Sequence, residues 1–130
     1  MARPKSKNLT KAEQRIMQVL WHRGEASVRQ IAADMSREHN LALTTVQTTT
    51  RILADKGYVK STKQGRSLIY SPLISKRTAQ AQALKTLLGG LFDNSPQLLA
   101  QHLVEADDLS EADIKALRAL LDNHISGDSL

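Results

Sequence analysis

The stretch LTTVQTTTRILADKG, which runs from Leu43 to Gly57, decides the fold of this chain. It contains TTVQ, which has the pattern of a helix capping box beginning at Thr44, and Gly57 is a helix-stop signal. Four of the six residues from Thr45 to Thr50 are threonine. Threonine is a poor helix former, because its branched β-carbon restricts side-chain rotation. The presence of four threonines in this part of the expected helix therefore needs an explanation.

The two faces of this helix carry different side chains, because successive residues are about 100° apart. One face is apolar or semi-polar, and we expect it to pack inward: Val46, Thr49, Thr50, Leu53 and Gly57. The opposite face is polar: Gln47, Thr48, Arg51 and Asp55. Thr45 and Ile52 lie along one flank. The N-terminal half of the outer face has almost no large apolar side chain, so it favours a polar partner.

Two more helices are expected before this one. The segments TKAE, from Thr10, and SVRQ, from Ser27, are capping boxes, and each leads into apolar residues at helical spacing. Gly24 ends the first of these helices, and the second runs to about Arg37. Three short helices within some fifty residues predict a small helical bundle.

After Gly57 the sequence period changes from helical to alternating. The segment YVKSTKQGRSLIYSP, residues 58–72, alternates on both sides of a Gln64-Gly65 turn and stops at Pro72. This pattern predicts a β-hairpin. Three helices followed by a basic hairpin describe a winged helix-turn-helix, a mainly α fold with a small β-hairpin wing. The same arrangement also occurs in modules that bind protein rather than nucleic acid.

Charge divides the chain at Pro72. Residues 1–72 contain 13 Lys+Arg and 5 Asp+Glu, a net charge of +8, whereas residues 73–130 contain 5 and 8, a net charge of −3. A basic half suits a polyanion, and an acidic, leucine-rich half does not. Scattered solvated charge without a partner is the alternative explanation.

The polar helix face and the basic hairpin together favour binding to double-stranded DNA. A recognition helix enters the major groove, where Gln or Arg can read base edges and Thr can contact thymine methyls or phosphates. We predict base reading by Gln47, Thr48 and Arg51, and assistance at the helix start by Thr44 and Thr45. Backbone contacts are predicted for three cations of the hairpin: Lys60, Lys63 and Arg66.

The acidic half predicts helices that share their apolar faces with a second copy of the chain. Thirteen of its 58 residues are leucine, and a unit this small has difficulty enclosing so much apolar surface alone. We expect Gly89-Gly90 to end one helix, and Ser95-Pro96 and Ser110 to begin the next two. The predicted dimerisation residues are Leu84, Leu87, Leu88, Leu91, Leu98, Leu99, Leu103, Ile114, Leu117 and Leu121. The alternative is a single closed core packed on the winged helix.

Several motifs resemble the penicillinase repressor family of the BlaI/MecI type over nearly the whole chain. The resemblance lies in TKAEQRIMQVLW, SVRQIAADM, TTVQTTTRILADKGYV, GRSLIYSP and the later DLSEADIKALRALLD. It implies a homodimeric transcriptional repressor that binds a dyad-symmetric operator through two winged helices, joined by helical C-terminal domains. Such symmetry predicts operator half-sites about 10 to 20 base pairs apart. The domains expected are residues 1–8 as a basic flexible tail, 9–73 as the winged helix and 74–126 as the dimerisation domain.

The chain departs from the family pattern at three places. Many members have Arg at the position of Ile52, whereas here the order is Arg51-Ile52, so a phosphate contact is expected to move to Arg51. Antibiotic-sensing members are cut at an Asn-Phe bond, and the corresponding region here reads AQHLVEADD. Copper-sensing relatives use clustered cysteines, and this chain has none. The expected inducer is a protease or ligand of a kind the sequence leaves open.

Composition argues against other classes of function. Zero cysteine excludes disulfides and thiolate chemistry, and the four histidines are isolated, so neither a metal site nor a cofactor is expected. The chain has no nucleophile-elbow or phosphate-loop motif, so we expect no enzyme. It has no signal-peptide pattern and no apolar run long enough to span a membrane. We expect a cytoplasmic protein without a membrane partner, and the alternative to a repressor is a winged-helix protein-interaction adaptor.

Overall fold

The computed structural model describes residues 8–36 and 42–128. The basic tail predicted at residues 1–8 lies outside this part except for Asn8, and the predicted helix end at Arg37 also lies outside it. The chain divides into two compact units, Met1–Leu84 and Lys85–Leu130.

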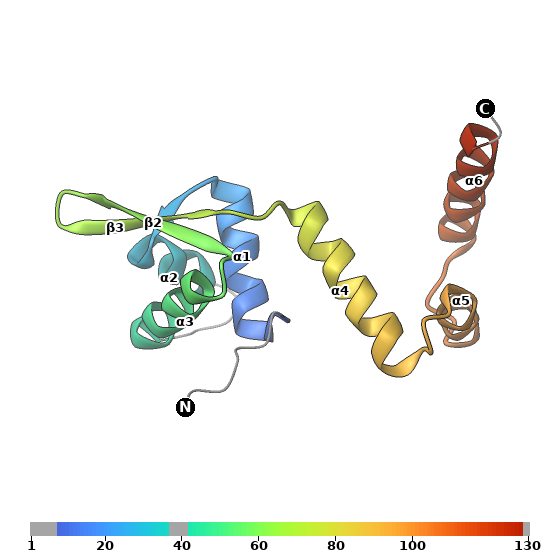
Figure 1. Cartoon of the computed structure of the whole chain (residues 1–130), viewed down its shortest axis with the longest axis horizontal. Coiled ribbons are helices and arrows are strands. Elements are labelled where there is room, and N and C mark those ends of the chain that lie inside the picture. Colours follow the sequence, from blue (N-terminus) through green and yellow to red (C-terminus); the bar gives the residue numbers. More distant parts are fainter. Residues whose placement is uncertain (1–7, 37–41, 129–130) are drawn as a thin grey trace. The chain divides into compact units, whose positions relative to one another are not determined.

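The first unit contains three helices and a small sheet (Figure 1). Its helices are α1 (Lys11–Arg23), α2 (Val28–Ser36) and α3 (Leu43–Asp55). Its strands are β1 (Ala26–Ser27), β2 (Val59–Gln64) and β3 (Ser67–Pro72). Helix α4 (Lys76–Leu91) begins in the first unit and ends in the second. The prediction of a mainly α fold with a β-hairpin wing is confirmed.

The sheet is antiparallel with the strand order β1-β3-β2. Strands β2 and β3 form the predicted hairpin, and because Gln64 pairs with Ser67, the loop is Gly65-Arg66. The turn thus lies one residue later than predicted, with Gly65 in the left-handed conformation at φ 60°. Strand β1 was not expected, since two residues are too short to show an alternating pattern.

The first two predicted capping boxes are present. The Thr10 N–H donates to Glu13 Oε1 at 2.7 Å, and the Glu13 N–H donates to Thr10 Oγ1 at 3.2 Å. Ser27 and Gln30 make the same reciprocal pair, at 2.9 and 3.2 Å. Gly24, at φ 87°, ends α1 as predicted. Local side-chain chemistry therefore defines the starts of α1 and α2.

The capping box predicted at Thr44 is wrong. Helix α3 begins at Leu43, and its N-cap is Ala42, which makes no side-chain capping bond. Thr44 already lies in the first helical turn, whereas a capping residue has an extended backbone just outside the helix. A threonine two residues inside a helix cannot be told from a capping threonine by sequence pattern alone.

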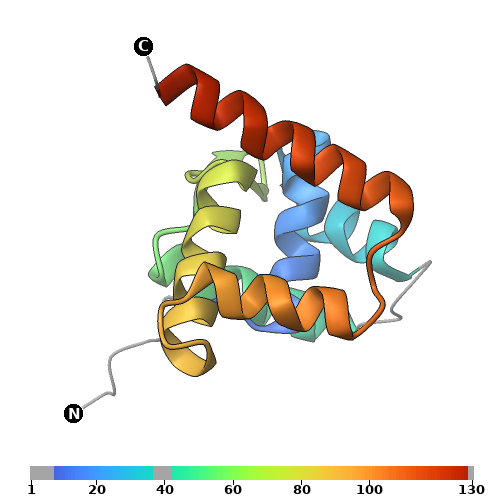
Figure 2. The same cartoon turned by 90° about the vertical axis from the view of Figure 1, so that its right-hand side faces the viewer.

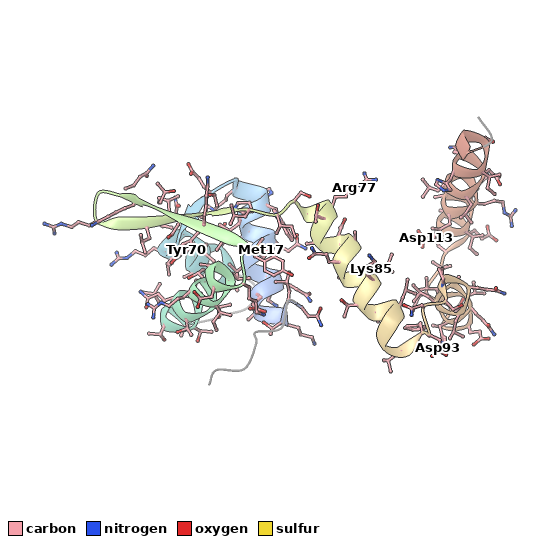
Figure 3. The ribbon with its side chains drawn as sticks, in the orientation of Figure 1. Met17, Tyr70, Arg77, Lys85, Asp93 and Asp113 are labelled. Atoms are coloured by element: carbon pink, nitrogen blue, oxygen red, sulfur yellow. The ribbon has the colours of Figure 1, made fainter. Side chains whose placement is uncertain are left out.

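The core of the first unit lies between the three helices and the sheet. Figure 3 shows Met17 on α1 and Tyr70 on β3 within this unit. The buried apolar residues are Ile16, Met17, Leu20, Ala26, Ile31, Met35, Val46, Leu53, Tyr58, Val59 and Tyr70. The predicted inner face of α3 is buried at Val46, Thr49, Thr50 and Leu53, and the predicted outer face is exposed at Gln47, Thr48, Arg51 and Asp55. The inward position expected for Gly57 is wrong, because α3 ends at Asp55 and Gly57 is exposed.

The inner threonines of α3 satisfy their own hydroxyl groups. Thr49 Oγ1 donates to the Thr45 carbonyl at 2.7 Å, and Thr50 Oγ1 donates to the Gln47 carbonyl at 2.9 Å. Such bonds to the preceding turn remove the cost of burying an unpaired hydroxyl. Two of the four threonines between positions 45 and 50, Thr49 and Thr50, are therefore explained as small core residues.

A buried ion pair joins α3 to α1. Lys56 Nζ lies 2.9 Å from Glu13 Oε2, and the two side chains are only 7% and 3% exposed. Lys56 Nζ also donates to the Asn8 carbonyl at 3.0 Å. Glu13 thus caps α1 and balances the charge of Lys56. This contact links residues 43 positions apart and holds the end of α3 against the start of α1.

The second unit contains the end of α4, then α5 (Pro96–Glu105) and α6 (Glu111–Asp128), which a short segment joins (Figure 2). The prediction that Gly89-Gly90 ends a helix is wrong, because α4 continues to Leu91. The chain turns instead at Asp93 and Asn94, whose φ angles are 50° and 58°. Asn tolerates the left-handed conformation that usually favours glycine, and its N–H closes α4 on the Leu88 carbonyl at 2.8 Å.

The predicted starts of α5 and α6 are confirmed. Ser95 Oγ accepts a hydrogen bond from the Leu98 N–H at 3.1 Å, and Pro96 is the first residue of α5. Ser110 and Asp113 form a reciprocal pair at the start of α6, with both bonds at 3.1 Å. The helices of the acidic half thus have the same kind of start signal as those of the basic half.

Candidate nucleic-acid interface

Helix α3 presents the polar face that the sequence predicted. All five predicted residues of the helix are exposed: Thr44, Thr45, Gln47, Thr48 and Arg51. The helix is fixed behind this face by its buried side and by the Lys56–Glu13 ion pair. Its exposed side chains therefore stand on a rigid element, which base recognition requires.

The wing separates the cations that the sequence grouped together. Lys63 pairs with Leu68, and Lys60 pairs with Ser71. Because side chains alternate along a strand, Lys63 and Leu68 share the face of buried Tyr70, whereas Lys60 lies on the opposite face. All three predicted wing cations are exposed, but Lys60 and Lys63 point to opposite sides of the hairpin.

A cleft of about 390 Å³ lies between the start of α2, helix α3 and the wing. It contains three of the predicted residues, Gln47, Arg51 and Arg66, together with Arg29, which was not predicted. Among the described residues that line it, none is acidic. The cleft thus gathers three guanidinium groups from three separate elements, and guanidinium is the side-chain group best matched to phosphate oxygens.

Arg29 was not predicted, because it lies neither on the outer face of α3 nor in the wing. It is the second residue of α2 and lies within the capping box that Ser27 and Gln30 form. In a helix-turn-helix, the helix before the recognition helix crosses the DNA backbone. A cation near the start of that helix was therefore a usable signal.

The start of α3 also offers backbone donors. The Val46 N–H makes the first bond of the helix, to the Ala42 carbonyl at 3.1 Å. The N–H groups of the first turn have no partner within a helix, and the Ala42 side chain has no acceptor for them. A phosphate oxygen can take that role at a helix N-terminus.

Two aromatic side chains, Trp21 and Tyr58, support the base of the wing. Trp21 Nε1 donates to the Ile74 carbonyl at 2.9 Å, which ties the segment after β3 to α1. Tyr58, next to β2, is buried, and this burial, followed by the nearby negative charge of Glu13, raises the pKa of its phenol above the ordinary value. The phenol therefore stays neutral and acts as packing for the wing base.

The predicted dimerisation residues do not form a closed core within the second unit. Leu88, Leu98 and Leu99 are half-buried. The other seven are exposed: Leu84, Leu87, Leu91, Leu103, Ile114, Leu117 and Leu121. Three further exposed apolar residues were missed: Val104 at 62%, Leu120 at 66% and Ile125 at 66%. Ile125 could have been found, since it continues the row of Leu117 and Leu121 at helical spacing.

Among residues 8–36 and 42–128, no group of three or more His, Asp or Glu side chains is arranged to hold a metal ion. Within the same ranges, no helix is both long enough and apolar enough to cross a membrane.

Residues 9–123 match the family described as penicillinase repressor. The chain is 23% identical to the methicillin resistance regulatory protein MecI of Mammaliicoccus sciuri, over 90% of this chain and 95% of the relative. It is also 23% identical to the penicillinase repressor of Bacillus licheniformis, over 89% and 91% of the two chains.

Two solved structures are also similar to this chain. The solution structure of the DNA-binding domain of the repressor BlaI matches with a TM-score of 0.51 and 26% identity, over 57% of this chain and 90% of that one. The oxidised form of MarR from E. coli matches 90% of this chain and 76% of its own, with a TM-score of 0.52. At 14% identity, the MarR likeness concerns the fold alone.

Proposed function

Because the chain belongs to the penicillinase repressor family, we propose that it represses transcription by binding a dyad-symmetric operator in double-stranded DNA as a homodimer. The observation that carries DNA binding is the cleft in which Arg29, Arg51 and Arg66 gather beside the exposed polar face of α3. A protein-interaction adaptor without DNA binding is not favoured, because the family consists of repressors and the cleft is lined by three arginines. The family role is transcriptional repression, which is not an enzymatic activity.

The proposed roles follow from the position of each group. Gln47, Thr48 and Arg51 read base edges, because they occupy the exposed face of the helix that enters the major groove. Thr44 and Thr45, with the backbone N–H groups beside them, bind a phosphate at the helix start. The remaining cations contact the DNA backbone: Arg29, Lys63 and Arg66, and also Lys60, which contributes less because it lies on the opposite face of the wing.

We propose that residues 74–126 form the dimerisation domain. The support is the exposure of large apolar side chains along α4, α5 and α6, among which Leu91 is 82% exposed. Removing apolar surface from water contributes roughly 25 cal/mol per Å². A second copy of the same helices can cover these side chains, and a closed pair of identical units is the commonest form of assembly.

A cytoplasmic location belongs to this proposal, since the relatives come from bacteria, whose chromosomal DNA lies in the cytoplasm. An inducing protease or ligand is a further proposed partner. The chain has no Asn-Phe pair and no cysteine, so release by cleavage at such a bond or by cysteine-bound copper is not part of the proposal.

The test is duplex binding by the full-length chain as a function of salt concentration. Fragments of the source genome that the protein selects serve as probes, and a scrambled duplex serves as the control. We expect the logarithm of the binding constant to fall linearly with the logarithm of salt, with a slope of about −0.9 for each neutralised phosphate. Equal binding of selected and scrambled duplexes at every salt concentration would contradict the proposal. Sedimentation as a monomer at micromolar concentration would contradict its dimeric part alone.

A further inference from the structure

Leu43 is an exposed apolar side chain beside the basic and polar groups of the cleft. It is the first residue of α3 and is 42% exposed. It lines the cleft that also contains Gln47, Arg51 and Arg29. An exposed leucine is common in proteins and needs no explanation by itself. Leu43 needs an explanation because it lies beside the groups that are proposed to read DNA.

Leu43, Gln47 and Arg51 form one row along α3. They are four residues apart, so they lie on the same side of the helix, and all three border the same cleft. Four residues correspond to a rise of about 6 Å along a helix axis. Stacked base pairs are about 3.4 Å apart. Neighbouring members of the row therefore reach base pairs that are one or two steps apart.

The three side chains have three different chemistries toward base edges. Gln pairs with two groups of adenine, and Arg pairs with two groups of guanine. Leucine has no donor or acceptor, so it can favour only an apolar group. The C5-methyl of thymine is the apolar group that an unmodified base presents in the major groove. Contact with that methyl would remove the exposed surface of Leu43 from water.

We propose that Leu43 is a specificity-determining residue that contacts a thymine methyl, one or two base pairs from the base that Gln47 reads. This inference rests on the proposed function, because it requires α3 to enter the major groove. It adds a contact with a thymine methyl that is separate from any that Thr48 makes. Leu68 also lines the cleft and is 47% exposed, but it lies on the wing and is not part of this row.

The experiment removes one methyl group at a time. The probe is a synthetic duplex that carries the half-site selected by the full-length wild-type chain from a randomised library. Each thymine is replaced in turn by deoxyuridine, which lacks only the methyl. We expect one replacement to weaken wild-type binding about fourfold, the factor that corresponds to one buried methyl group. Leu43→Ala should bind the thymine and deoxyuridine duplexes equally.

Leu73→Ala is the matched control. Leu73 is also an exposed leucine of the first unit, at 57%, but it does not line the cleft. It should retain the wild-type fourfold discrimination. Thermal unfolding of both variants, followed by Trp21 fluorescence, checks that the first unit stays folded.

The possible results separate this inference from the proposed function. If Leu43→Ala keeps the penalty for deoxyuridine, or if the wild type is indifferent to every thymine methyl, the role of Leu43 is overturned while operator binding stands. If the wild-type chain selects no half-site at all, the proposed function fails, and the role of Leu43 fails with it.

Discussion

The two units of this chain place similar apolar patterns in opposite surroundings. In α1, Ile16, Met17 and Leu20 recur at helical spacing, and all three are fully buried. In α6, Leu117 and Leu121 recur in the same way, yet they are 42% and 63% exposed. An apolar row on a helix therefore shows that a face will be covered but does not show what covers it. In the first unit the chain itself does so, whereas in the second we propose a second copy.

The contrast extends to charge. The first unit pairs Lys56 with Glu13 in its interior and leaves cations such as Arg51 and Arg66 on its surface. The second unit leaves its leucines exposed and has a net negative half-chain around them. A surface that repels DNA while retaining apolar groups suits contact between protein copies. Four pairs of variants test this division, from the largest expected effect to the smallest.

Glu13→Gln tests whether the first unit depends on its internal ion pair. Gln still suits the capping box, but Lys56 loses its buried counter-charge. We expect the free energy of unfolding to fall by about 3 kcal/mol or more, because an unpaired buried charge is costly. Urea denaturation followed by the fluorescence of Trp21 measures this unit, since Trp21 is the only tryptophan of the chain.

Arg23→Ala is the control for this variant. It breaks the exposed Arg23–Asp34 pair, whose Nε to Oδ2 distance is 2.6 Å and whose side chains are 35% and 30% exposed. Solvent screens such a pair, so the loss of stability should be much smaller. Equal losses of unfolding free energy for Glu13→Gln and Arg23→Ala would show that burial does not make the Lys56–Glu13 pair more stabilising than the exposed pair.

Leu121→Asp tests whether the second unit depends on another molecule. A charge on the apolar row of α6 should weaken self-association by about 2 kcal/mol or more, the size of effect seen at central interface residues. Analytical ultracentrifugation measures the change, and the denaturation midpoint reported by Trp21 should stay near the wild-type value. Asn123→Asp adds the same charge on the opposite face of α6 and should leave association unchanged. Association that survives Leu121→Asp would place the interface elsewhere.

Gln47→Ala tests the reading face of the first unit. Loss of a bidentate contact should cost about 1–3 kcal/mol on the selected duplex and much less on a scrambled one. Binding to single-substitution duplexes, measured by fluorescence anisotropy, should show that preference is lost at one position. Thr48→Ala, which shortens the neighbouring side chain on the same face, is the variant whose binding to the same duplexes is compared with that of Gln47→Ala. A uniform loss on all duplexes would reassign Gln47 to the DNA backbone.

Lys63→Ala and Lys60→Ala test the two faces of the wing and have the smallest expected effect. Lys63→Ala should weaken binding to all sequences alike and reduce the salt slope by about one. Lys60 lies on the opposite face of the hairpin, so its removal should change the slope less. Identical slopes for the two variants would show that the side of the strand does not matter. A changed base preference for Lys63→Ala would show that the wing reads sequence.

Several features were predictable from sequence because they depend only on neighbouring residues. The capping pairs at Thr10 and Ser27 each lie within one helical turn, and the alternation of residues 58–72 is a property of the strands themselves. The inner and outer faces of α3 follow from its period, which is why the exposed position of Gln47 and the burial of Thr50 were both expected. Polar groups at these positions already favoured a DNA-binding helix.

Other features were decided only by contacts between distant segments. Arg29 and Arg66 meet at one cleft although 37 positions separate them, and strand β1 exists only because Ala26 pairs with Tyr70. The start of α3 at Leu43 and the passage of α4 through Gly89-Gly90 also differed from the local signals. Sequence patterns report the preferences of a short segment, whereas the partner of a buried lysine or the face of a strand is chosen by residues far along the chain. The helix faces were thus determined locally, and the composition of the cleft was determined by the tertiary fold.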